Sequence, residues 1–136
     1  MDELIKAIIT KLSGSALSTA VNGRISLDDC LPDGCEFPYI VFFIVSSTPE
    51  WEFTERFENT LIQFSLFSNS ESAVEITGML EDLESLFDDC SLSITGYTLI
   101  WFRRQNIRTM VKEIITATGT QIIKHYAVDY EAKVQE

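Results

Sequence analysis

Apolar residues recur at helical spacing in two parts of the chain, residues 2–13 and residues 71–88. In both, they follow one another in steps of three and four and leave polar residues on the opposite side, as in a helix with one buried face. Ser68 and Ser72 each offer a capping box at the start of the second segment. The apolar stripes are Leu4, Ile5, Ile8, Ile9 and Leu12 in the first and Ala73, Ile76, Leu80, Leu83 and Phe87 in the second.

Two strands are predicted between these helices. Residues 39–45 are a continuous run of β-branched and aromatic residues, which indicates a strand buried on both faces at the centre of a sheet. Residues 59–67 alternate, so that one face carries the apolar side chains. The 13 residues between them, 46–58, exceed the two to five residues of a tight hairpin and predict a long loop. The apolar face of the second strand is Ile62, Phe64 and Leu66.

The carboxy-terminal part of the chain predicts two further strands. Residues 97–112 are rich in β-formers, although a helix from residue 104 onward remains an alternative. After a turn at 118–120, a last strand places four apolar residues on one face, and the tail from Lys133 is expected to fray. That face consists of Ile122, Tyr126, Val128 and Tyr130.

The region after the first helix is less regular. Residues 15–23 predict no definite element, but Asn22-Gly23 indicates a turn and residues 24–27 a short strand. Pro32, Gly34 and Pro38 make residues 28–38 a loop. The whole order contains no βαβ repeat. We therefore expect an α+β fold in one domain, residues 1–136, with a mostly antiparallel sheet of four to five strands, two helices and a long hairpin loop.

The charge of the chain narrows the possible partners. The formal net charge is −11, and an acidic surface repels phosphate, so we expect no nucleic-acid partner. No apolar stretch approaches the roughly 20 residues that span a bilayer, and the first residues lack the features of a signal peptide. We therefore expect no membrane association and a cytoplasmic protein.

Catalysis, cofactors and metals are not indicated by any motif. The six glycines form no phosphate loop, no Gly-x-Ser-x-Gly elbow occurs, and the only histidine, His125, lies in an alternating apolar segment. We expect no catalytic residue, no cofactor and no metal site. Three acids, Asp28, Asp29 and Asp33, hint weakly at a divalent cation, but a solvated loop is the stronger interpretation. The cysteines Cys30, Cys35 and Cys90 are expected to be reduced thiols.

Four of the ten cations lie within ten positions, at Arg103, Arg104, Arg108 and Lys112. One interpretation is that they pair with acids of neighbouring strands in the same chain. The other is that they meet the acidic helix of an adjacent copy and fix the register between subunits. Both interpretations stay open at the level of the sequence.

Large apolar residues alternate with acids in the predicted loop, where Trp51, Phe53 and Phe57 stand among four glutamates. Exposed aromatics of this kind anchor protein interfaces, so we expect a contact with another subunit or another protein here. The alternative is that these residues fold back onto the sheet and extend the hairpin.

Three short segments resemble the amino-terminal signature of small phage tail-completion proteins. They are Asn22-Gly23-Arg24-Ile25, then Leu31-Pro32-Asp33-Gly34, then Phe37-Pro38-Tyr39-Ile40-Val41. The resemblance continues through Phe64-Ser65-Leu66-Phe67-Ser68 and a following helix, Glu71 to Phe87, and in the order of its elements covers residues 4 to 131. At residues 103–118 the match is looser.

The resemblance implies a tail terminator, a non-enzymatic protein that assembles as a ring, expected to be a hexamer. Such a ring caps the completed tail tube and joins it to the head connector. The implied partners are other copies of the chain, a tail-tube protein and a head-connector protein, in the host cytoplasm during assembly and then in the virion tail. A neck or head-closure protein of the same virion, or a non-viral binding module, are the alternatives.

Overall fold

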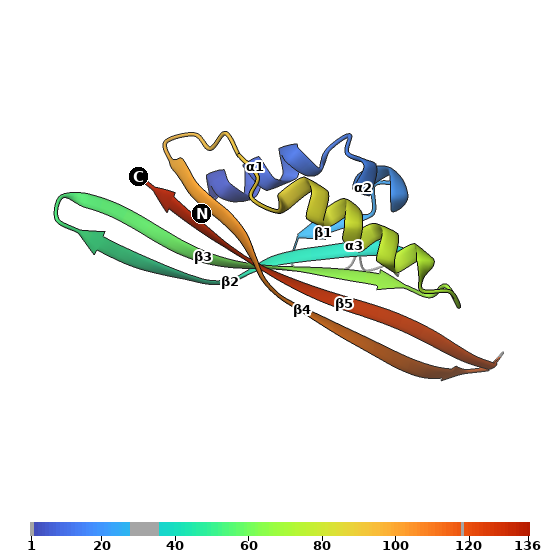
Figure 1. Ribbon diagram of the computed structural model, residues 1–136. Helices are drawn as coiled ribbons and strands as arrows, with labels where there is room; N and C mark the ends of the chain where they lie inside the picture. The colour runs from blue at the N-terminus through green and yellow to red at the C-terminus, as the bar shows by residue number, and fades with distance from the viewer. Residues whose placement is uncertain (1, 28–35, 118) are drawn as a thin grey trace.

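The computed structural model describes residues 2–27, 36–117 and 119–136 of the chain. In this part the elements follow in the order α1 (Asp2–Leu12), α2 (Ala16–Ala20), β1 (Ile25–Leu27), β2 (Tyr39–Glu52), β3 (Glu55–Ser68), α3 (Val74–Phe87), β4 (Thr98–Thr116) and β5 (Gly119–Gln135). The helices form a layer on one face of the sheet, and no described helix covers the other face (Figure 1). We call these the helix-covered face and the open face.

The five strands lie in the order β1-β2-β3-β5-β4. The short β1 runs parallel to β2, and every other neighbouring pair is antiparallel. The predicted α+β class with a mostly antiparallel sheet is therefore confirmed. The sheet is open: β4 forms one edge, and on the other side β1 accompanies β2 only as far as Phe42.

A long β-hairpin replaces the loop that the sequence predicts over 46–58. Strands β2 and β3 pair without interruption from Ser46–Leu61 to Glu52–Glu55, and only two residues, Phe53 and Thr54, turn the chain. The prediction of a loop is wrong because the alternation of aromatics and acids there is itself a strand pattern, one that continues beyond the helix layer.

The position of β2 also differs from the prediction. It is the second strand of the sheet, and β3 holds the central place. Its burial alternates: Ile40 and Phe42 are buried on the helix-covered face, whereas Val41 and Phe43 on the open face are only half-buried. A continuous apolar run here reflects an apolar open face rather than a second buried layer.

The hydrophobic core lies between the helices and the helix-covered face. An aromatic group at its centre joins β3, α3, β4 and β5: Phe64, Phe87, Phe102 and Tyr130 are fully buried, and their ring centroids are 4.9–6.1 Å apart in five contacts. Contacts of this kind hold their rings in fixed relative orientations and add to the stability that burial itself provides. The alternation predicted for Ile62, Phe64 and Leu66 is confirmed, since all three are buried.

Helix α3 is shorter than the predicted 71–88, and its start differs in detail. Its first turn follows Ala73, which has no side-chain cap. The capping boxes do not form: Ser72 Oγ accepts from Val74 N, and Ser68 Oγ donates to the Glu75 carboxylate at 2.6 Å. The buried stripe is Ile76, Met79, Leu83 and Phe87, with Leu80 at its margin.

Helix α2 is an element that the sequence pattern does not predict. It has five residues, and Ser15 caps it by accepting from Ser18 N at 3.1 Å. Such a short helix buries only Leu17, so it has no periodicity that a search could recognise. The predicted turn and strand that follow are confirmed, with Asn22 and Gly23 at positive φ and β1 next.

Strands β4 and β5 form a second long hairpin, which confirms a strand rather than a helix beyond residue 104. Register shifts at Ile100 and Gln105 interrupt the pairing. The four residues predicted to share a face of β5 do so, although Ile122 is 39% exposed near the tip. The predicted fraying from Lys133 is wrong, because Val134 is buried and the N–H of Glu136 donates to the carbonyl of Arg56.

Candidate interaction surfaces

Two hairpins extend from opposite ends of the molecule (Figure 1). We name residues 46–61, the part of β2–β3 beyond the bulge at Val45, the acidic hairpin. It carries four acids against one cation, a formal charge of −3. We name residues 108–127 of β4–β5 the basic hairpin. It carries three cations against one acid, a formal charge of +2 with its histidine neutral.

Trp51 and Phe53 are exposed on the acidic hairpin. Trp51 lies on the helix-covered side and is 63% exposed, with the Arg56 guanidinium 4.5 Å from its ring centroid. Phe53 is at the tip, fully exposed, with a φ of 51°. Positive φ at the first position of a two-residue turn favours glycine. The exposed ring therefore stands on a backbone that local energetics disfavour for phenylalanine.

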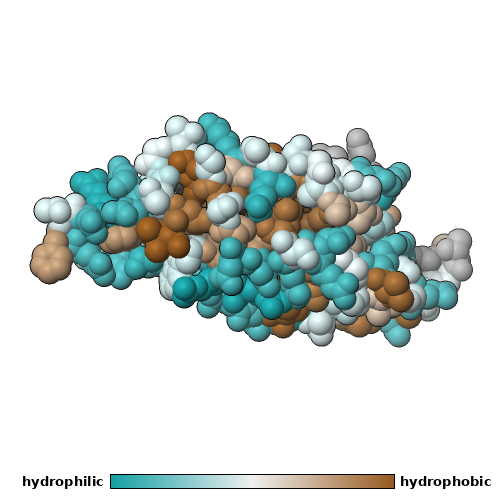
Figure 2. Space-filling model, turned by 45° about the horizontal axis from the view of Figure 1, so that its top comes forward, coloured by the Kyte–Doolittle hydropathy of each residue, from teal (hydrophilic) through white to brown (hydrophobic). Residues whose placement is uncertain are grey.

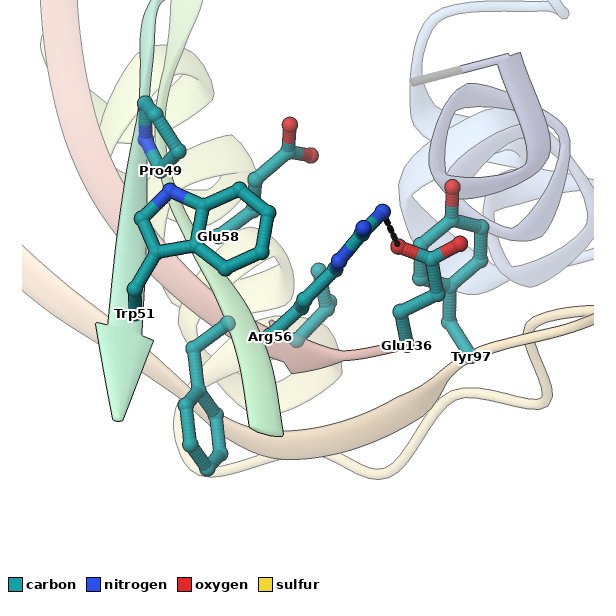
Figure 3. Close-up of a pocket in the computed structure, with 8 residues that line it drawn as sticks. Pro49, Trp51, Arg56, Glu58, Tyr97 and Glu136 are labelled. Atoms are coloured by element: carbon teal, nitrogen blue, oxygen red, sulfur yellow. Dashed lines mark ion pairs between the residues drawn. The ribbon is translucent and has the colours of Figure 1, made fainter. Parts of the chain in front are cut away.

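A cleft of about 150 Å³ lies beside Trp51, where the acidic hairpin meets the end of β5. Arg56 reaches across it from beside Trp51 to Glu136, with which it forms an ion pair at 3.8 Å (Figure 3). Ligand pockets have volumes of roughly 300–1,000 Å³. This cleft is smaller, and the hairpin's own guanidinium crosses it, so it suits one inserted side chain better than a substrate.

Phe57 lies on the open face, so it is on the other side of the sheet from Trp51. Lys133 of β5 covers its ring at 4.8 Å from the centroid and forms an ion pair with Glu50 at 3.4 Å. Asn59 donates to the same carboxylate at 2.8 Å. The hydrogen bond from Asn59, followed by Lys133, lowers the pKa of Glu50. Phe57 is thus packed within its own chain, which separates it from the two exposed aromatics.

Arg104 pairs inside the chain. It lies on the helix-covered face and forms ion pairs with Glu84 and, at 3.4 Å, with Asp88 of α3. The hydroxyl of the buried Tyr130 donates to Asp88 at 2.6 Å. Burial, together with this bond to a carboxylate, raises the pKa of Tyr130. These four side chains fasten the end of α3 to β4 and β5.

Arg103 lies on the other side of the sheet from Arg104. Its guanidinium stacks over the Trp101 ring, 4.0 Å from the centroid, and the register sets it opposite Glu131 of β5. The bulge at Gln105 then keeps Arg108 and Lys112 on the same open face as Arg103. The four cations that the sequence groups together therefore divide into Arg104 on one face and three residues on the other.

Arg108 and Lys112 are exposed on the basic hairpin. No ion pair to either side chain occurs among the residues that the structure describes. Arg108 lies close enough to His125 to lower the pKa of its imidazole, in addition to the larger effect of burial. The third cation, Lys124, is occupied, because its ammonium donates to the carbonyls of Ser70 and Glu71.

Exposed apolar side chains that the sequence analysis did not single out accompany these cations. Figure 2 shows apolar groups over both hairpin tips among hydrophilic neighbours. On the basic hairpin, the alternation of β4 could have revealed them, since a strand with apolar residues on both faces beyond the core must expose one set. They are Met110 (41% exposed), Val111 (67%), Ile115 (87%) and Ile122 (39%).

The part of the chain that the structure describes contains no cluster of three or more His, Cys, Asp or Glu side chains placed to hold a metal ion. The acids Asp28, Asp29 and Asp33 and the thiols Cys30 and Cys35 lie outside the described residues. None of the described helices has both the length and the apolar character to cross a bilayer.

Two of the three segments of the amino-terminal signature meet in the fold, and the third, Leu31-Pro32-Asp33-Gly34, lies outside the described residues. Gly23, at a φ of 74°, turns the chain into β1, and the Arg24 side chain donates to the carbonyls of Phe37 and Pro38 at 3.1 and 3.0 Å. Ile25 and Ile40 are neighbours across the parallel pair β1–β2. The Gly-Arg-Ile and Pro-Tyr segments thus form one structural unit.

No family model matches the chain, and no curated protein matches it by sequence. Among solved structures, one protein described as "Virion of native gene transfer agent (GTA) particle" matches with a TM-score of 0.75 at 12% identity, over 96% of this chain and 93% of the other. Another, whose name gives no function, matches with a TM-score of 0.57 at 11% identity, over 96% and 94%. The chain therefore has, over nearly its full length, the fold of a protein of the gene transfer agent virion.

Proposed function

We propose that the protein is a non-enzymatic structural component of a phage or phage-like particle, a tail terminator that forms a ring on the completed tail tube and joins it to the head connector. The observation that carries the proposal is the fold shared with the virion protein, at a TM-score of 0.75 over nearly the whole of both chains. The unit formed by Arg24 and the Phe37-Pro38 carbonyls adds the tail-completion signature to that match.

The distribution of charge supports assembly through different surfaces on each copy. A ring needs a heterologous interface, in which one surface of a copy meets another surface of the next. The acidic hairpin at −3 and the basic hairpin at +2 are two such surfaces at opposite ends of one sheet. In the proposed ring, expected to be a hexamer, the aromatics Trp51 and Phe53 remain available for the tail tube or for a neighbouring copy.

Removal of the gene from a particle-producing strain tests the role. Without a terminator, nothing limits the tail tube, so we expect tubes of abnormal length and heads without tails in electron micrographs. Tails of normal length beside leaking heads would instead identify a neck or head-closure protein. Absence of the protein from purified wild-type particles would reject a virion role and leave a non-viral binding module.

A solution measurement tests the ring itself. Sedimentation velocity of the purified protein over a concentration series should show a monomer in equilibrium with a larger closed oligomer. A symmetric dimer as the only associated species at the highest concentration would exclude the ring, because a two-fold interface uses the same surface on both copies.

A further inference from the structure

Four charged side chains on the open face of the sheet have no partner among the described residues, and they form one acidic and one basic pair. The register places Glu52 and Glu55 opposite each other on the open face of the acidic hairpin, and Arg108 and Lys112 on the open face of the basic hairpin. All four residues are exposed. Within the described part of the chain, none of the four makes an ion pair or side-chain hydrogen bond.

Of the other charges on the two hairpins, three are occupied, and the remaining two, Glu58 and Glu113, lie on the helix-covered face. Glu50 is held by Asn59 and Lys133, and Arg56 by Glu136 and the Trp51 ring. Lys124 donates to two backbone carbonyls at the entrance to α3. On the open face, each hairpin therefore offers a partner a pair of like charges, and the two pairs have opposite signs.

The two pairs cannot satisfy each other within one copy, because the hairpins extend from opposite ends of the molecule (Figure 1). Each hairpin also has a free edge, with no described strand beside it. On the basic hairpin this is the edge of β4, and on the acidic hairpin it is the edge of β2, because β1 accompanies β2 only up to Phe42. Two copies can therefore approach side by side, with the open faces of their sheets on the same side.

We infer that the acidic hairpin of one copy lies beside the basic hairpin of the next, with Glu52 and Glu55 facing Arg108 and Lys112. The inference rests on the proposed ring and specifies its subunit contact. It replaces the contact expected from the sequence, between the cation cluster and the acidic helix of a neighbour, because Arg104 already pairs with Glu84 and Asp88 of its own α3. The exposed side chain of Met110 lies on the same open face, between Arg108 and Lys112.

Reversal of the charges tests the contact by complementation. The first variant, Arg108→Glu/Lys112→Glu, has two acidic hairpins, and the second, Glu52→Lys/Glu55→Lys, has two basic ones. Like charges then oppose each other in either variant alone, so sedimentation velocity should show association weakened by about tenfold or more in each. An equimolar mixture should regain association, because each variant supplies the partner that the other lacks. A chain that carries all four changes should again associate with itself.

Matched controls separate the local contact from the change in net charge. Lys6→Glu/Lys11→Glu changes the charge as the first variant does, on α1, and Glu71→Lys/Glu81→Lys changes it as the second does, just before α3 and on it. Far-ultraviolet circular dichroism and thermal melts check that every variant folds, and we expect both controls to associate like the wild type.

Three results would overturn the inference: a wild type that stays monomeric at the highest concentration, reversal variants that associate like the wild type, or a mixture of folded variants that remains dissociated. These results are distinct from a failure of the proposed function. A protein found in particles whose association ignores the reversals keeps its function and loses this contact. A protein absent from particles that shows the complementation keeps the contact and loses the function.

Discussion

The hydroxyl of Tyr130 donates to the Asp88 carboxylate at 2.6 Å, and this bond ties the buried face of the sheet to the end of α3. The Tyr130 ring is fully enclosed, whereas the Asp88 side chain keeps 34% of its surface in contact with solvent and also pairs with Arg104. The helix has no basic residue in its last turn. Arg104 thus supplies from β4 the cation that would offset the helix dipole.

We expect Tyr130→Phe to lower the free energy of unfolding by about 1.5 kcal/mol, because it removes a hydrogen bond to a charged acceptor and leaves the packing intact. Urea denaturation measures the change. Tyr126→Phe is the control, since Tyr126 is half-buried and its hydroxyl has no hydrogen-bond partner among the described residues, and its effect should stay within about 0.5 kcal/mol. Equal losses in the two variants would contradict the role of the Asp88 bond.

Arg104 and Glu84 should show a small, salt-dependent coupling. Both side chains are about one-third exposed, at 34% and 30%. A double-mutant cycle with Arg104→Gln and Glu84→Gln is therefore expected to give a coupling of about 0.5–1 kcal/mol that falls as salt is added. The same cycle with Arg103→Gln should give none, because Arg103 lies on the other face. A coupling to Arg103 of equal size would contradict the placement of Arg103 and Arg104 on opposite faces of β4.

His125 should make the fold less stable in mild acid. Burial, and then Arg108, lowers the pKa of its imidazole below the ordinary 6.5. The unfolded chain therefore takes up this proton at a higher pH than the folded chain. The contribution of His125 to stability is complete above about pH 6.5 and is lost as the pH falls from there towards the folded pKa.

Thermal melts of the wild type and His125→Phe between pH 7.5 and 5 test this dependence. The wild type should lose more stability over the interval, because the phenyl ring can keep the stack on Phe67, whose centroid is 4.2 Å away, without titrating. Since His125 is the only histidine, its proton resonance reports the pKa directly. A value at or above 6.5 would refute the prediction.

The thiol of Cys90 is expected to be unreactive in the folded protein. It is half-buried, and burial raises its pKa to about 11. At pH 8, about one thiol in a thousand is then ionised, against about a quarter for an ordinary cysteine. In a Cys30→Ser/Cys35→Ser background, maleimide should label Cys90 at least about 100-fold more slowly in buffer than in urea. Similar rates in the two solutions would rule out this environment.

Two replacements of Phe53 should separate the effect of its backbone conformation on stability from the effect of its aromatic ring. Phe53→Gly removes the strain of positive φ, which costs about 1–2 kcal/mol, but glycine also gains entropy in the unfolded chain. The net effect is expected to be a rise of about 0.5 kcal/mol in the free energy of unfolding. Phe53→Ala keeps the strained backbone and removes only the ring, so stability should stay nearly unchanged. A loss of stability in Phe53→Ala would indicate that the ring contributes to the monomer.

The sequence predicts well those elements whose pattern matches their burial. Ile62, Phe64 and Leu66 alternate and are alternately buried, and the stripe of α3 ends at Phe87 as expected. The prediction is wrong where a strand leaves the core. In residues 46–58 acids and aromatics alternate, and the alternation indicates a strand. The strand has no buried face there, however, and the many polar residues favour a loop, which is what the sequence predicts.

The candidate interface could be predicted only in part. The sequence groups Arg103, Arg104, Arg108 and Lys112, but spacing alone does not reveal the bulge at Gln105, which places Arg108 and Lys112 on the face of Arg103 and not on that of Arg104. Nor does it reveal that Lys133 covers Phe57, since that contact joins positions far apart in the chain. Pairing between distant strands decides which charges remain free, and local patterns do not contain that information.

The opposite directions of the two hairpins bear on how the number of subunits is limited. In any open row of copies joined as inferred, one acidic hairpin stays unmatched at one end and one basic hairpin at the other, however long the row becomes. Adding a copy moves these two unmatched hairpins farther apart but leaves both unmatched. Joining them to each other ends growth without a separate stop signal, and the angle between neighbours then fixes how many copies the closed assembly holds.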